Sequence, residues 1–319
     1  MAGVIHELPL ERRTLHGHFS IDLDPVLRIE PGDSVRFSTI DAGWGMEGGA
    51  PGGRDRPRFE PRHPAYDSGH PLVGPIEIAG ARAGQVLAVK IDELRVGTYG
   101  FTDAGGWPSW LNDRLGVAGG ETATLWWELD DDAGTGRNQH GWEVELRPFL
   151  GVIGMPPPAG DMWHSTTPPR RWGGNIDCAE LVVGSTLFLP IPVDGAMLSL
   201  GDGHARQADG EVSGLAIECP MASAQVTVDV RDAFELDAPL ARTESAWIAF
   251  GFDEDLDDAL AQALDSMLEL IAREHGIERK EGLALASVAV DMRVTQVVNA
   301  IKGVHAVLRD DAVRFGDDG

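Results

Sequence analysis

The sequence is short of lysine, which occurs at only three positions, Lys90, Lys280 and Lys302. Asp and Glu number 51 against 26 lysines and arginines, so the formal net charge is −25. Nucleic acids and anionic membrane surfaces would repel such a chain, and we expect neither as a partner. An acidic surface that is poor in lysine also fits adaptation to salt, because ions screen its self-repulsion.

Cysteine is scarcer still, with only Cys178 and Cys219 present. Two cysteines cannot build the disulfide framework of a small secreted protein, so we expect both to be free, buried thiols. They stand close in sequence to Glu180 and Glu218, as a Cys-Glu-Lys amidase would require, but the shortage of lysine argues against that mechanism.

Long apolar runs are also lacking. No stretch of the sequence approaches the roughly 18 to 20 uninterrupted apolar residues that a membrane span needs. Residues 1–13 contain no apolar run behind a basic segment, so they do not resemble a secretion signal. We therefore expect a cytoplasmic protein.

Turn-forming residues, in contrast, are plentiful. The 40 glycines and 20 prolines predict many short strands joined by turns. We expect a β-rich α+β fold, with a β-sandwich or barrel-like body and a small C-terminal α/β section. We divide the chain into lobes of residues 1–135, 136–250 and 251–319, intertwined around one site that the second lobe supplies with its polar motifs.

The N-terminal lobe is predicted to begin with a hairpin. Residues 26–29 and 35–39 show the alternation and β-branching of strands, and Pro31, Gly32 and Asp33 supply a turn between them. Residues 43–69 are rich in Gly, Pro and Arg without any period, which indicates a long loop that covers another part of the protein.

The C-terminal lobe changes character. Between residues 253 and 271 the apolar side chains recur at spacings of three and four, which predicts an amphipathic helix. Asp253 is placed to cap this helix and Gly276 to end it. A second, less regular helix is predicted within residues 283–298.

The densest polar cluster begins at Gly201. Asp202 and His204 are two residues apart, so in an extended segment both side chains project to one face, and Asp209 and Glu211 repeat the arrangement. Imidazole and carboxylate groups are usual ligands of divalent cations, and a catalytic zinc site keeps one position for water. The alternatives are a solvated loop or a structural calcium site, although the ligand spacing of an EF-hand is absent.

A second cluster ends at Asp177. Gly173 and Gly174 permit close backbone approach, while Asn175 and Asp177 alternate toward one side and can form hydrogen bonds. An Asx-type turn is the structural alternative for this segment.

Two histidines outside these clusters are further candidates. His70 adjoins the loop of residues 43–69 and could face a site, or it could be a structural turn residue. His18 lies on a probable strand, where either a binding or a structural role would suit it.

Both clusters resemble motifs of the acetamidase/formamidase family, in their order and in their surroundings. The resemblance extends to residues 31–33, 39–42, 70–75, 151–154, 295–299 and 303–306, so it covers nearly the whole chain. Its most specific parts are Gly173-Gly174-Asn175-Ile176-Asp177, Gly184-Ser185-Thr186-Leu187, Gly201-Asp202-Gly203-His204-Ala205 and Asp209-Gly210-Glu211.

This sequence departs from the family pattern at two places. Ala208 stands where glycine is usual, and residues 16–20 differ from the Asn- and Trp-containing segment of many members. The second departure suggests a subgroup with another substrate.

The resemblance implies a hydrolase that converts small linear amides, such as formamide or acetamide, to ammonia and a carboxylate. It also implies a β-rich fold, a homodimer or higher homo-oligomer, and a divalent metal, zinc or calcium, that activates water. The remaining alternative is a non-catalytic β-sandwich that binds a small ligand or structural calcium.

We predict that Asp202 and His204 hold the metal, with help from Asp177 or Asp41. Amide hydrolysis also needs a proton for the leaving nitrogen, and either Glu211 or Glu218 could carry it.

The substrate itself needs hydrogen-bonding partners. We predict that Asn175 bonds the substrate or the reaction intermediate, and that His70 and His18 contribute to substrate binding.

Overall fold

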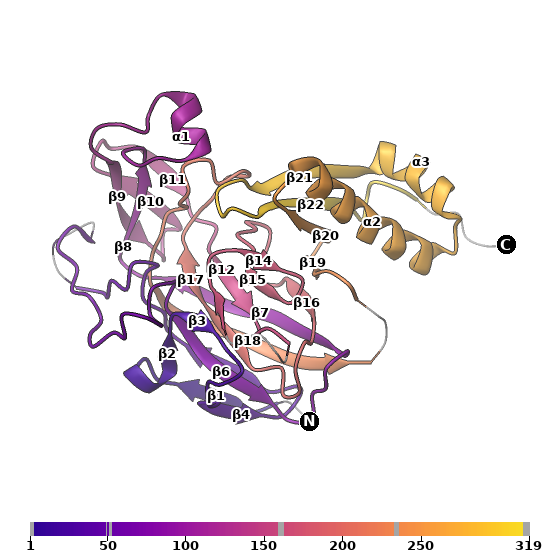
Figure 1. The fold of residues 1–319 in the computed structure, drawn as a ribbon, viewed down its shortest axis with the longest axis horizontal. Helices are drawn as coiled ribbons and strands as arrows, with labels where there is room; N and C mark the ends of the chain where they lie inside the picture. The colour runs from indigo at the N-terminus through magenta and orange to yellow at the C-terminus, as the bar shows by residue number, and fades with distance from the viewer. Residues whose placement is uncertain (1–2, 49, 51–52, 159–162, 233–235, 315–319) are drawn as a thin grey trace.

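Two large sheets pack face to face and form the body of the protein (Figure 1). The computed structural model describes residues 3–48, 50, 53–158, 163–232 and 236–314. The main hydrophobic core lies between the sheets, where Val89 and Val226 of one sheet and Val73 and Leu200 of the other are all fully buried. Neither large sheet closes on itself within these ranges, so the predicted β-rich body is a sandwich rather than a barrel.

The larger sheet has nine strands. Two of its inner strands, β7 and β18, are 11 residues long and rich in β-branched residues, and along β18 buried residues alternate with partly exposed ones. It contains strands from all three of the lobes drawn from the sequence, so those lobes share one sheet. In spatial order the strands are β1 (Ile5–Leu8), β5 (Ser34–Phe37), β18 (Met221–Arg231), β7 (Val86–Val96), β16 (Thr186–Pro190), β19 (Leu240–Arg242), β20 (Ala246–Asp253), β22 (Lys302–Arg309) and β21 (Val290–Gln296).

The second large sheet has seven strands and carries the polar motifs. Its strands are β14 (Pro169–Arg170), β15 (Gly173–Asn175), β12 (Phe149–Gly154), β17 (Leu198–His204), β6 (Leu72–Ile78) and β2 (Leu15–His16), with β4 (Leu27–Ile29) also paired to β6. All seven residues of β17 are buried, although the strand includes Asp202 and His204. Buried polar side chains in a strand of this kind indicate a site rather than ordinary core.

Two small sheets and four helical segments complete the described chain. A four-stranded sheet contains β11 (Glu143–Glu145), β10 (Thr135–Asn138), β9 (Ala123–Asp130) and β8 (Tyr99–Ala104), and β13 (His164–Ser165) pairs with β3 (His18–Phe19). The helical segments are the 3₁₀ turn η1 (Arg12–Thr14), α1 (Trp110–Leu115), α2 (Leu256–His275) and α3 (Arg279–Ala289). None of the described helices is long and apolar enough to cross a bilayer.

The predicted hairpin in the N-terminal lobe is wrong. β4 pairs in parallel with β6, whereas β5 pairs with β1 and β18, so the two strands belong to different sheets. Their pairing partners are distant in sequence, and a local turn signal cannot identify such partners.

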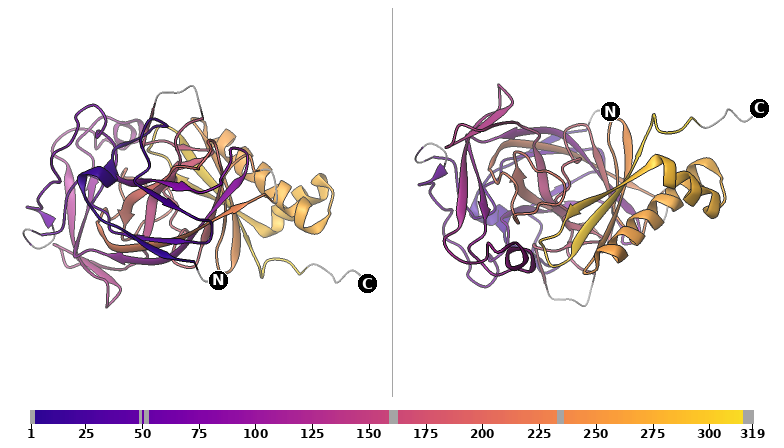
Figure 2. Two further views of the ribbon diagram at one scale, coloured as in Figure 1. Left: turned by 90° about the horizontal axis from the view of Figure 1, so that it is seen from below. Right: turned by 90° about the horizontal axis from the view of Figure 1, so that it is seen from above.

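The C-terminal section projects from the body and contains α2 and α3 against β20, β22 and β21 (Figures 1 and 2). α2 is confirmed, with Gly276 in the left-handed conformation that ends it, but its cap is Asp255 rather than Asp253. The second helix ends earlier than predicted, because residues 290–296 form β21.

Close packing of α2 on the sheet depends on one glycine. Gly251 of β20 lies so near the helix that an added Cβ would be 2.0 Å from the carbonyl oxygen of Ala259. Ala259, Ala263 and Met267, which are fully buried, form part of the helix face that packs there. Small residues thus let helix and strand approach each other.

Candidate active site

Three neighbouring strands bring the two polar motifs together. β12 lies between β15 and β17, and the pairing of Leu150 with Gly203 and of Val152 with Gly201 sets Gly151 opposite Asp202. Asp177 follows β15, and its backbone N–H donates to the carbonyl of Gly151 at 3.3 Å. Both carboxylates therefore flank Gly151.

Because Gly151 has no side chain, there is space beside it for the side chains of Asp177, Asp202 and His204. A Cβ at this position would be 2.5 Å from Asp202 Oδ2, 2.6 Å from Asp177 Oδ1 and 2.7 Å from His204 Cε1. Such distances are too short for any real Cβ, so a side chain here would displace the cluster.

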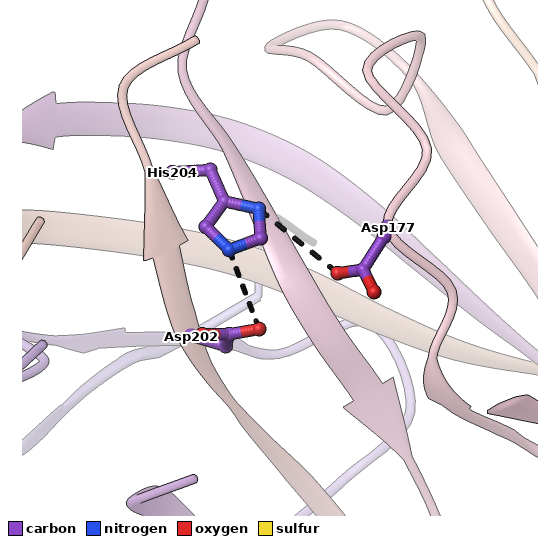
Figure 3. Close-up of side chains that lie close together, drawn as sticks. All are labelled: Asp177, Asp202 and His204. Carbon is purple, nitrogen blue, oxygen red and sulfur yellow. Dashed lines mark ion pairs between the residues drawn. The ribbon is translucent and has the colours of Figure 1, made fainter. Parts of the chain in front are cut away.

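Asp177, Asp202 and His204 form a compact group that could hold a metal ion (Figure 3). His204 Nε2 lies 3.4 Å from Asp202 Oδ2, and Nδ1 lies 4.0 Å from Asp177 Oδ1. One ligand atom from each residue lies within 4.8 Å of the others, and each residue is at most 2% exposed. Ligand atoms around one tetrahedral zinc are about 3.3 Å apart, as follows from bond lengths near 2 Å, so small shifts would suffice.

Glu218 joins this group from a neighbouring segment. Its Oε2 is 3.2 Å from His204 Nε2, and its Oε1 accepts a hydrogen bond from the backbone N–H of Ala216 at 3.0 Å. An isolated bridge between the backbones of His204 and Glu218 fixes the approach.

Many polar atoms of the cluster have no hydrogen-bond partner among the described residues, although buried polar atoms normally have one. Carboxylate and amide oxygens of this kind, gathered around one imidazole, suit a bound cation or a ligand with hydrogen-bond donors. The six atoms are Asn175 Oδ1, Asp177 Oδ1, Asp202 Oδ1, His204 Nδ1, Glu211 Oε2 and Glu218 Oε2, the last of which has only its ion pair with His204 Nε2.

The charges of the cluster are unevenly balanced. Burial raises the pKa of Asp177 to about 8 and, with the charge of Asp177, raises the pKa of Glu211 well above its usual value. Burial also raises the pKa of Glu218. The carboxylates thus outnumber the positive charge that could stabilise them, and a divalent cation would correct the imbalance.

Asp202 and His204 behave in the opposite way. Burial alone would raise the pKa of Asp202, but His70 and His204 outweigh it and lower the pKa to about 2. Burial alone would lower the pKa of His204, but Glu218 and Asp202 raise it well above its usual value. These two side chains form the charged centre of the cluster.

The backbone is strained at three of the carboxylates. Asp177, Asp202 and Glu211 have φ angles of 53°, 61° and 44°, in the left-handed region that residues other than glycine rarely adopt. Each such conformation costs on the order of 1 kcal/mol or more, and strain of this kind is typical of functional sites.

Part of the cluster lines a cavity of about 320 Å³, whereas Asp177 is not among the residues that line it. Asn175 and His70 line it together with Asp202, His204, Glu211 and Glu218, whereas Phe101 and Leu215 supply apolar wall. Thr166 Oγ1 lies 3.0 Å from His70 Nδ1 and accepts a hydrogen bond from the His70 backbone N–H, which holds the ring in place. His70 and Asn175 thus both line the cavity, and their predicted substrate-binding role stays a prediction.

Asp41 does not join the group, and its predicted role as a metal ligand is not retained. Its Oδ1 accepts from the backbone N–H groups of Gly43 and Gly45, and its Oδ2 accepts from Arg56 Nε and from Tyr99 Oη. With both oxygens engaged, Asp41 instead anchors the loop of residues 43–69, as far as that loop is described.

His18 does not face the cavity either, so its predicted role in substrate binding there is not retained. It lines a separate cavity of about 620 Å³ that shares no lining residue with the candidate site. Its Nδ1 donates to the backbone carbonyl of Tyr66 at 3.0 Å.

Sequence reasoning assigned no role to Gly151 or Asn299, although both segments belong to the resemblance. Asn299 lines the cavity and donates from Nδ2 to Asp177 Oδ2 at 2.7 Å. Neither residue stands near the carboxylates in sequence, so only the pairing of distant strands reveals them.

Comparison with known proteins identifies the family. The model of the acetamidase/formamidase family matches residues 6–167 and 159–309 of this chain. The chain belongs to this family. The match covers the strands and loops that carry Asp177, Asp202, His204 and Asn299 alike.

Individual members of the family are similar in sequence and in fold. A formamidase from Methylophilus methylotrophus is 26% identical over 62% of this chain, but the match spans only 60% of that relative's length. A predicted acetamidase/formamidase from Thermoanaerobacter tengcongensis is 25% identical, with a TM-score of 0.82 over 97% of this chain and 96% of the other. An acetamidase from Bacillus halodurans is 27% identical, with a TM-score of 0.79 over 95% and 97% of the two chains.

Proposed function

We propose that this protein hydrolyses small linear amides, such as formamide or acetamide, to ammonia and a carboxylate. The observation that carries the proposal is the buried group of Asp177, Asp202 and His204, of which Asp202 and His204 line a cavity and each residue has an atom without a hydrogen-bond partner in the described chain. Membership of the acetamidase/formamidase family supports the same chemistry.

The donor set fits a divalent cation. Asp177, Asp202 and His204 would hold it, and Glu218 is close enough to serve as a further ligand. One imidazole among carboxylates suits zinc, whereas calcium, the alternative, takes oxygen ligands alone and more of them. When bound, such an ion lowers the pKa of water from about 16 to about 7 and polarises an amide carbonyl.

Glu211 is the residue best placed to move a proton. Its Oε2 is buried and has no hydrogen-bond partner among the described residues, and Glu211 lines the cavity. Burial and the charge of Asp177 raise the pKa of Glu211, which favours the protonated carboxyl that would deliver a proton to the leaving nitrogen. Glu218 is held by Ala216 and His204, which suits a ligand better than a proton carrier.

Asn175 and His70 would orient the substrate. Asn175 Oδ1 is an unpartnered acceptor that can bind the N–H of a carboxamide, and the Asn175 residue is only 3% exposed. His70 lies across the same cavity and can donate to a carbonyl oxygen or accept from the amide. Together they would fix a small planar amide against the carboxylates.

The geometry disfavours a cysteine nucleophile. Cys178 and Cys219 are free and fully buried, as predicted, and neither lines the cavity. Burial raises the pKa of both thiols, which holds them in the unreactive protonated form. A Cys178→Ser protein should therefore keep its activity.

The test is ammonia release from formamide, acetamide and propionamide, measured with and without a chelator. We expect release that stops on chelation and returns with added zinc. Release that a chelator leaves unchanged would overturn the metal-dependent mechanism. No release from any of these amides, with a melting temperature that falls on chelation, would favour a structural metal site in a non-catalytic protein.

Two further properties go with this proposal. Free, buried thiols fit the reducing cytoplasm.

Exposed Leu283 and Val288 on α3 suit contact with a second copy, in a homodimer or higher homo-oligomer. Light scattering of the purified protein would measure the assembly, and a mass equal to one chain would exclude it.

A further inference from the structure

One side chain from the C-terminal section reaches the candidate site. Strand β21 runs from the helices toward the body and β22 returns antiparallel to it, and the loop between them carries Asn299 (Figure 1). Asn299 lines the cavity, and its Nδ2 donates to Asp177 Oδ2 at 2.7 Å. These residues are 122 positions apart in sequence.

The loop that carries Asn299 is held by a buried glutamine. Gln296 is 0% exposed, and its Oε1 accepts from the backbone N–H groups of Val298 at 2.9 Å and Asn299 at 3.1 Å. Its Nε2 donates to the carbonyl of Ile301 at 2.6 Å. The glutamine thus bonds both sides of the loop and fixes the position of Asn299.

The same segment also supports the loop of the predicted proton carrier. The backbone N–H of Gly210 donates to the carbonyl of Thr295 at 3.1 Å, and the N–H of Val297 donates to the carbonyl of Gly210 at 3.2 Å. Gly210 directly precedes Glu211. The C-terminal section therefore contacts the site at two points.

We propose that Asn299 is a positioning residue, which fixes the carboxylate of Asp177 for binding of a divalent cation and so makes the site depend on the C-terminal section. The inference rests on the proposed function. Asn299 donates to Oδ2 of Asp177, while Oδ1 lies 4.0 Å from His204 Nδ1 and has no hydrogen-bond partner in the described chain.

The physical reason is the orientation of a short side chain. Without the bond from Asn299, the Asp177 carboxylate can rotate, and both of its oxygens lack a hydrogen-bonding side chain. A residue that holds a metal ligand in place typically contributes 10-fold to 100-fold to metal affinity, although it never touches the metal.

The experiment replaces Asn299 by leucine, which has a similar size but cannot donate a hydrogen bond. Affinity for Zn²⁺ is measured by competition with a chelator, and the melting temperature of the metal-free protein is measured beside it. Val298→Ala is the matched control, because Val298 adjoins Asn299 and only its backbone contributes to the loop bonds.

We expect Asn299→Leu to weaken Zn²⁺ binding about 10-fold to 100-fold with little change in the melting temperature of the metal-free protein, and Val298→Ala to bind as the original protein does. Unchanged affinity in Asn299→Leu would overturn this inference and leave the proposed function standing. A loss of affinity matched by a large drop in the metal-free melting temperature would also overturn it, since Asn299 would then have only a structural role. Failure of the original protein to bind Zn²⁺ would overturn the proposed metal site itself.

Discussion

The helix α2 and the candidate site follow opposite local rules. α2 buries apolar residues on one face, is capped by Asp255 and ends at Gly276 in a left-handed conformation. The site instead buries carboxylates, leaves polar atoms unpartnered and places Asp177 and Asp202 at positive φ. A regular helix avoids buried charge, unpaired polar atoms and backbone strain. At the site these features lower the stability of the fold, so other parts of the protein must stabilise it.

The comparison indicates which of the two regions a bound ligand would stabilise. Apolar contacts of α2 with the sheet stabilise the C-terminal section without any bound group. The carboxylates of the site would instead be stabilised by the proposed cation, which would balance their charge. Substitutions in the two regions should therefore differ in whether metal changes their effect.

The largest effect should come from His204→Ala. Loss of the single imidazole of the group should remove metal binding and turnover together. The loss of metal affinity should exceed the 10-fold to 100-fold decrease that follows when a residue supporting a ligand is replaced. Metal content and ammonia release measure the two losses, with the exposed His140→Ala as control. A His204→Ala protein with its original rate would remove the proposed mechanism.

Glu211→Gln should separate chemistry from metal binding. The amide keeps the shape of the side chain but cannot transfer the proton, so kcat should fall by about 10²-fold to 10⁴-fold. Metal content should stay as before, because Glu211 is outside the group of Asp177, Asp202 and His204. Exposed Glu121→Gln is the control. Equal rates in both variants would reassign the proton to another residue.

Gly151→Ala tests the room within the site. The added methyl would displace Asp177, Asp202 and His204, and a displacement of about 1 Å costs about 10²-fold in rate. Gly119→Ala is the matched control, since its Cβ would meet nothing within 4 Å and no positive φ is involved. If Gly151→Ala binds metal and turns over like the control, the described geometry is wrong.

The C-terminal section should also make the free energy of unfolding depend on pH, independently of the site. His305 on β22 is buried, and burial lowers its pKa to about 4. An unfolded histidine takes up its proton near pH 6.5, so stability should fall as the pH drops from about 6.5 to about 4, by up to about 3 kcal/mol. Denaturant unfolding of the protein and of His305→Asn would measure this term. Identical pH profiles would exclude it.

The smallest effect should come from Asp255→Ala at the cap of α2. The side chain accepts from the backbone N–H groups of Asp257 and Asp258, and loss of such a cap costs about 1 kcal/mol. Metal affinity should not change, in contrast to substitution of His204. A change in metal affinity here would break the distinction between the two regions.

Sequence reasoning succeeded where the determinants are local. The spacing of apolar residues predicted α2, and Gly276 predicted its end. The two-residue spacing of Asp202 and His204 predicted that both lie at one site. It failed where partners are distant: β4 and β5 belong to different sheets, and Asn299 reaches Asp177 from the C-terminal section. Asp41 shows a third limit, because a carboxylate already bound by Arg56 and Tyr99 has the same sequence signal as a free one.

The most direct test of the central claim is a crystal structure of the protein prepared with zinc, with anomalous scattering recorded at the zinc edge. We expect an anomalous peak between Asp177, Asp202 and His204, within bonding distance of all three side chains. Density that shows these three side chains bonded only to protein or water, with no peak at the zinc edge, would contradict the account.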